Sequence, residues 1–112
     1  MDNNAESPLV TVIIASYNHG QYIEESILSV LNQTYTNIEL LVIDDGSSDD
    51  SVERITALQN QHGFYFKVQK NQGLSSTLND AIAMSKGSLI APFGSDDVMV
   101  AERIALQVAH MA

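Results

Sequence analysis

The 112-residue sequence predicts an α/β fold of three layers, in which helices cover both faces of a mainly parallel, Rossmann-like sheet. Two observations lead to this prediction. Apolar segments of strand length alternate with amphipathic helical patterns in the order βαβαβαβ. The first apolar segment, residues 9–15 (LVTVIIA), is an unbroken run rich in β-branched residues, which is typical of a central strand buried on both faces. The connections between the parallel strands are expected to be right-handed crossovers.

A helix is predicted directly after this strand, from Asn18 to about Gln33. Asn18 and Gln21 have the spacing of a capping pair, so Asn18 is expected to cap the helix. Glu24 and Glu25 lie off the apolar face, which carries Ile23, Ile27, Val30 and Leu31.

The second strand is predicted over residues 38–43 (IELLVI), and an acidic turn separates it from the next helix. Asp50 and Glu53 are placed to cap that helix, whose apolar face carries Val52, Ile55 and Leu58. A third strand is predicted over residues 64–69 (FYFKVQ).

The third helix is predicted over residues 74–86, with Gly87 as its C-cap. Its apolar side is expected to consist of Leu74, Leu78, Ala81 and Ile82. The fourth strand is predicted over residues 88–93, where Pro92 favours a strand end or a sheet edge because it lacks a backbone donor. A last helical pattern covers residues 100–112.

Composition limits the classes of protein and partner. The length suits one domain or part of a larger one, with a flexible start over residues 1–8. A formal net charge of −9 opposes binding to nucleic acid or to anionic membranes. Cysteine is absent, and no stretch has the length of a transmembrane helix or the pattern of a secretory signal. We therefore expect a soluble, cytoplasmic segment.

Acidic pairs follow two of the predicted strands, Asp44 and Asp45 after the second and Asp96 and Asp97 after the fourth. The carboxyl ends of parallel strands share one edge, where such folds bind ligands. Four carboxylates on one edge would repel each other unless a cation lay between them, and their oxygens suit Mg²⁺ or Mn²⁺. The alternative is ordinary turn and cap chemistry, which Asp, Gly and Ser also serve.

Several spaced motifs resemble one family. Residues 10–51 (VTVIIASYNHGQYIEESILSVLNQTYTNIELLVIDDGSSDDS) and residues 71–97 (NQGLSSTLNDAIAMSKGSLIAPFGSDD) are similar to the nucleotide-sugar-binding half of family 2 glycosyltransferases. The resemblance extends from Leu9 to about Arg103. It implies that residues 9–112 form the N-terminal, nucleotide-sugar-binding part of a GT-A fold, truncated before its acceptor half.

The resemblance also implies site residues. Tyr17, next to Ala15 at the end of the first strand, would lie against the nucleobase. Asp45, with Asp44 beside it at an exposed strand end, would hydrogen-bond the uracil or ribose. Lys70 and the turn formed by Asn71 and Gly73 would border the nucleotide pocket. Asp96 and Asp97 would hold the metal, Mn²⁺ or Mg²⁺, under the diphosphate, and Asp97 is slightly favoured as its ligand.

Two positions depart from the family pattern. Many members have a third Asp where this chain has Gly94, and Leu78 stands where relatives often have Arg. His19 is expected to be a solvated loop residue.

The implied reaction is inverting transfer from a nucleotide sugar, with UDP as the expected nucleotide, to a hydroxyl of a saccharide or glycoconjugate acceptor. The catalytic base is expected beyond residue 112, so the chain alone should not transfer sugar. The full-length protein is expected in the cytoplasm, at the inner membrane face. Two alternatives stay open, a non-catalytic nucleotide-binding or interaction remnant and a Mg²⁺-dependent phosphoacceptor signalling module. The second would need an acidic pair after the first strand, where this chain has ASYN.

Overall fold

The computed structural model describes residues 7–111, and these form the predicted alternation of strands and helices. The predicted flexible start lies outside the described residues except for Ser7 and Pro8. The elements in chain order are β1 (Val10–Ser16), α1 (Gly20–Leu31), β2 (Ile38–Asp44), α2 (Ser51–His62), β3 (Tyr65–Val68), α3 (Leu74–Met84), β4 (Leu89–Gly94) and α4 (Arg103–Met111).

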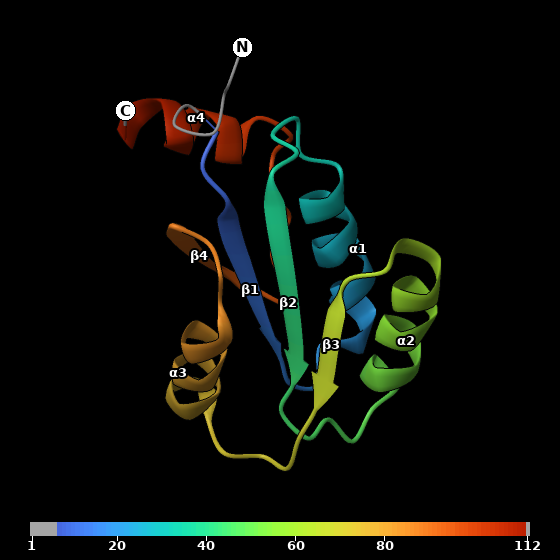
Figure 1. Ribbon diagram of the computed structural model, residues 1–112. Coiled ribbons are helices and arrows are strands. Elements are labelled where there is room, and N and C mark those ends of the chain that lie inside the picture. Colours follow the sequence, from blue (N-terminus) through green and yellow to red (C-terminus); the bar gives the residue numbers. More distant parts are fainter. Residues whose placement is uncertain (1–6, 112) are drawn as a thin grey trace.

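The strands form one parallel sheet in the order β3-β2-β1-β4 (Figure 1). β1 therefore lies between two neighbours, which confirms the predicted central strand. β4 lies at an edge of the described sheet, as Pro92 indicated. The register pairs Ser16 with Asp44 and Ala15 with Gly94, so these three strands end at one edge of the sheet.

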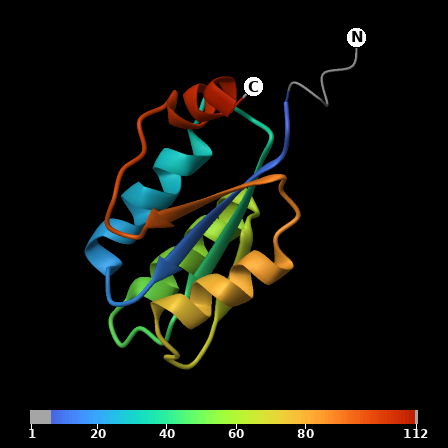
Figure 2. The ribbon, with the colours of Figure 1, turned by 90° about the vertical axis from the view of Figure 1, so that its left-hand side faces the viewer.

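Helices cover both faces of the sheet, which confirms the three-layer prediction. Figure 2 shows α1 on one side of the sheet and α3 on the other. Side chains alternate along β1 accordingly: Val12 and Ile14 pack in the core beneath α1 and α2, while Ile13 packs with Ala81 of α3. α4 contributes Ile104 and Val108 to the larger core and lies near the start of β1 (Figure 1).

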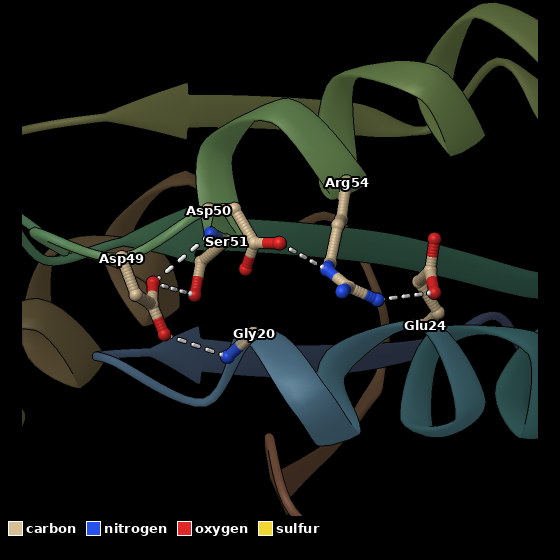
Figure 3. Close-up of polar contacts among 6 residues, drawn as sticks. All are labelled: Gly20, Glu24, Asp49, Asp50, Ser51 and Arg54. Carbon is tan, nitrogen blue, oxygen red and sulfur yellow. Dashed lines mark hydrogen bonds and ion pairs between the residues drawn. The ribbon is translucent and has the colours of Figure 1, made fainter.

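The capping hydrogen bonds of α1 and α2 differ from the predicted ones. Asn18 has a left-handed backbone (φ 54°) and its Oδ1 accepts the N–H of Ser48 at 2.8 Å, so it does not cap α1. The carboxylate of Asp49 accepts the N–H of Gly20 instead, at 2.9 Å (Figure 3). Sequence spacing missed this cap because the donor and the acceptor are 29 residues apart.

Asp50 is the N-cap residue of α2, as predicted, but its side chain makes no capping hydrogen bond, and Asp49 accepts the N–H of Ser51. Asp50 instead forms an ion pair with Arg54 at 2.8 Å, and Arg54 reaches Glu24 of α1 at 3.0 Å (Figure 3). These contacts bind the start of α2 to α1.

The apolar side of α3 is smaller than predicted. Ala81 is buried and Leu78 packs beside it, but Leu74 and Ile82 are 63% and 42% exposed. Ser85, not Gly87, is the C-cap. Gly87 lies against β1, where a Cβ would come within 2.5 Å of the Thr11 hydroxyl oxygen, so close backbone approach explains this glycine.

Within residues 7–111, no helix has both the length and the apolar character that crossing a membrane requires.

Candidate functional site

Two adjoining cavities lie at the carboxyl edge of the sheet. One, of 230 Å³, lies between the end of β1, Asp45 and the start of α3. The other, of 490 Å³, extends toward Ser95 and Asp96 after β4. Both are lined by Ala15, Tyr17 and Leu74. A larger concavity of 660 Å³ lies at the opposite end of β2, and none of the predicted site residues lines it.

Five of the predicted site residues line the two cavities, namely Ala15, Tyr17, Asp45, Gly73 and Asp96. Tyr17 borders both cavities and is 48% exposed, so its side chain is accessible to a ligand. Asp44, Lys70 and Asp97 do not line either cavity. Lys70 is exposed on the loop after β3.

Asp45 is only 5% exposed, so its expected place at an exposed strand end was wrong. Its Oδ1 accepts hydrogen bonds from Gln69 Nε2 at 3.0 Å and from the N–H of Gln72 at 2.9 Å. Its Oδ2 accepts the N–H of Gly73 at 3.1 Å. Burial alone would raise the pKa of this carboxyl, but these hydrogen bonds outweigh it and hold the pKa below its usual value. Asp45 is therefore a carboxylate that fixes the loop before α3.

Asp44 is fully buried and closes the turn after β2. Its two oxygens accept the N–H and the hydroxyl of Ser47, at 2.8 and 2.6 Å. Hydrogen bonds from the protein thus compensate both Asp44 and Asp45, and no cation is needed between them. Among residues 7–111, no three histidine or acidic side chains are grouped so as to hold a metal ion. The prediction of one four-carboxylate cluster was wrong.

Asp96 and Asp97 are exposed and lie together at the end of β4. Oδ2 of Asp97 and Oδ1 of Asp96 would lie 2.6 and 3.2 Å from a Cβ on Gly94. The missing side chain of Gly94 therefore leaves room for both carboxylates. Mg²⁺-type ions commonly bind through one or two carboxylates, with waters and substrate phosphates as the other ligands. This pair fits such an ion.

Three further residues line the cavities: Asn71, which the resemblance placed at the pocket, His19, expected near its edge, and Thr77, which was not predicted. His19 is half-buried, not solvated, and its Nδ1 lies 2.6 Å from the Ser95 hydroxyl beside Asp96. Asn71 lines the smaller cavity and donates to the Asp45 carbonyl at 3.2 Å. Thr77 lines it too and receives a hydrogen bond from Gln69 at 2.9 Å. The Asn-x-Gly spacing of Asn71 and Gly73 was the sequence signal for Asn71, whereas Thr77 had none.

Comparison with known proteins identifies relatives. A family model described as "Glycosyl transferase family 2" matches residues 11–112. An uncharacterized glycosyltransferase of Nostoc sp., alr2836, is 41% identical over 91 residues, which cover 80% of this chain and 28% of that protein. Chondroitin synthase of Escherichia coli is 36% identical over 100 residues, which cover 88% of this chain and 15% of the synthase. The chain spans 28%, 42% and 33% of the lengths of three uncharacterized relatives.

Solved structures share the fold. Residues 1–349 of S. aureus TarS in complex with UDP-GlcNAc superpose with a TM-score of 0.83 at 24% identity, covering 92% of this chain and 31% of that one. The mannosyltransferase PcManGT from Pyrobaculum calidifontis, in complex with GDP-Man and Mn²⁺, gives a TM-score of 0.74 at 25% identity, covering 81% and 28%.

Proposed function

Because the chain belongs to glycosyl transferase family 2 and has the GT-A fold of such enzymes, we propose that it binds a nucleoside-diphosphate sugar, with uridine as the nucleoside, through a divalent cation. The observation that carries the proposal is the pair of adjoining cavities. Asp45 borders one, Asp96 borders the other, and Tyr17 lines both. The two adjoining cavities thus offer different chemistry to a base and to a diphosphate.

The smaller cavity is proposed to hold the nucleobase and ribose. The exposed side chain of Tyr17 offers a stacking surface, which suits a flat base. Asp45 and Asn71 supply an acceptor and a donor beside it, and Gly73 leaves the backbone close to the ligand. TarS, whose structure holds UDP-GlcNAc, supports uridine as the base.

Asp96 and Asp97 would hold Mn²⁺ or Mg²⁺. When bound, such a cation stabilises the negative charge of the departing nucleoside diphosphate. The chain has five Lys and Arg residues against fourteen Asp and Glu, and Lys70 lines neither cavity. The basic side chains of the protein are therefore poorly placed to stabilise the charge of the diphosphate. The Mn²⁺ in the PcManGT complex supports this assignment.

Transfer would invert the anomeric carbon, with a carboxylate base that deprotonates a hydroxyl of a saccharide or glycoconjugate acceptor. Glu102 is the one carboxylate after Asp97 in the sequence, and it is exposed just before α4. We therefore propose that the base comes from a part of the relatives that this chain does not match.

The similarity to chondroitin synthase supports a saccharide acceptor. A cytoplasmic location stays a prediction.

Calorimetric titration of UDP and of GDP into the chain, both in Mn²⁺, tests the nucleotide site. We expect weak binding of UDP, weaker binding of GDP, and no sugar transfer in a product assay with several UDP-sugars. Failure of both nucleotides to bind would overturn the proposed site. Equal affinity for UDP and GDP would overturn the uridine preference, and turnover would show that the chain contains a base.

A further inference from the structure

The segment that carries the acidic pair has no regular structure of its own. Residues 95–102, between β4 and α4, are neither strand nor helix. Their backbone groups must therefore find partners elsewhere, since buried backbone donors and acceptors are almost always paired. Several of those partners are side chains of α1 and of its C-terminal end, namely Ser26, Ser29 and Gln33.

These side chains bond successive points of the segment. The Ser26 hydroxyl donates to the Ser95 carbonyl at 2.9 Å and also contacts the Asp97 carbonyl. The Ser29 hydroxyl accepts the N–H of Met99 at 2.9 Å. Gln33 donates to the Val100 carbonyl at 2.7 Å and accepts the N–H of Ile104 at 3.0 Å.

The spacing explains how α1 and the residues just after it hold the segment. Ser29 lies three positions after Ser26, so these two side chains share one side of α1, and Gln33 follows just beyond the end of the helix at Leu31. Ser26 is 0% exposed and Gln33 is 7% exposed. Apolar residues would fill such buried positions without a desolvation penalty, so the hydrogen bonds are what favours polar side chains there.

We propose that Ser26 is a positioning residue for the acidic pair, an inference that rests on the proposed function. The two carbonyls that its hydroxyl bonds belong to Ser95 and Asp97, which flank Asp96. Ser26 thereby fixes the backbone from which the carboxylates of Asp96 and Asp97 project. Its removal should weaken binding of a divalent cation and leave the nucleoside cavity intact, because the hydrogen bonds to the Asp45 carboxylate come from residues 69–73 and not from this segment.

The test compares Ser26→Ala with Thr11→Val in the whole chain. Thr11 is also fully buried and hydrogen-bonded, to Glu39 at 2.7 Å, but it lies toward the opposite end of β1. The readouts are the affinity for uridine, which has no phosphate, by NMR titration, and the Mn²⁺ concentration that half-saturates UDP binding. Ser26→Cys, close to serine in size but a weak donor, separates lost hydrogen bonding from lost packing.

We expect Ser26→Ala and Ser26→Cys to raise the half-saturating Mn²⁺ concentration about three- to tenfold, the factor that corresponds to one ordinary hydrogen bond. Uridine affinity should stay at the wild-type value in both, and Thr11→Val should change neither readout. An unchanged Mn²⁺ requirement in either Ser26 variant, or an equal loss of uridine and Mn²⁺ binding, would overturn the inference. A wild-type chain that binds UDP without any effect of Mn²⁺ would instead refute the metal site in the proposed function.

Discussion

The carboxylate of Asp45 accepts the backbone N–H of Gly73 at 3.1 Å and so joins the end of β2 to the start of α3. Gly73 has a left-handed backbone, with φ of 91°, which a side chain would strain. The same carboxylate accepts hydrogen bonds from Gln69 and Gln72. One buried acidic residue therefore fixes the loop before α3, which lines the smaller cavity.

Asp45→Ala should destabilise the fold as well as weaken UDP binding. The substitution leaves the N–H groups of Gln72 and Gly73 without their acceptor, and hydrogen bonds to a charged group contribute about 1.5 to 3 kcal/mol. Urea unfolding should show a loss of about 2 kcal/mol. Asp80→Ala is the control, because that exposed carboxylate accepts only from the Gln72 side chain among the described residues. Equal stability of Asp45→Ala and wild type would show that the loop does not depend on Asp45.

Acid should remove the contribution of Asp45 to stability. The pKa of its carboxyl is lower in the folded chain than its usual value of about 3.9, so its contribution is complete above that pH and is lost as the pH falls through the folded pKa. Asp45→Asn should therefore be less stable than wild type at neutral pH, and the difference should shrink below about pH 4. Urea titrations at neutral and acidic pH measure both values. A difference that does not change with pH would contradict the lowered pKa.

Gly94→Ala should weaken Mn²⁺-dependent UDP binding with little loss of stability. Its Cβ would lie 2.6 Å from Oδ2 of Asp97, and this exposed carboxylate can move away at low cost. The movement separates Asp97 from Asp96, so the half-saturating Mn²⁺ concentration should rise several-fold. Thermal unfolding reports stability in the same samples. Wild-type Mn²⁺ dependence would mean that the two carboxylates need not lie together.

Ile13→Asp should unfold the chain. Ile13 is fully buried in the central strand. The free-energy cost of burying an unpaired charge there is comparable to the whole free energy of unfolding of a typical domain, about 5 to 15 kcal/mol. Glu24→Ala breaks only a surface ion pair with Arg54 and should cost less than about 1 kcal/mol. Circular dichroism during heating compares the two variants, and similar transitions would mean that the burial of β1 is wrong.

The strands and their order along the chain could be predicted because burial on both faces leaves a clear pattern. The unbroken apolar run over residues 9–15 predicted the central strand, observed as β1 over Val10–Ser16. Pro92 likewise indicated an edge, and β4 lies at one. Helix faces were less certain, because periodicity does not reveal how much of a helix the sheet covers. Leu74 and Ile82 were predicted on the apolar side of α3 for that reason, and both are exposed.

The roles of the acidic residues could not be predicted from local pattern alone. Asp44 closes a local turn, Asp45 holds a distant loop, and Asp49 caps a helix 29 residues earlier. These residues share one short stretch, and only the folded positions of their donors distinguish them. Ser26 and Gln33 were missed in the same way, since their partners lie about seventy residues later, at separations of 71 and 67 residues.

Titration of UDP into the chain, first with Mn²⁺ and then with EDTA, tests most directly whether Asp96 and Asp97 bind a diphosphate through a cation. We expect binding with Mn²⁺, none with EDTA, and none in either solution for a double variant with Asp96→Ala and Asp97→Ala. Circular dichroism should show that the double variant is folded, because both side chains are exposed. UDP binding of equal affinity in Mn²⁺ and in EDTA, or unchanged binding by the double variant, would contradict a metal-bridged diphosphate site.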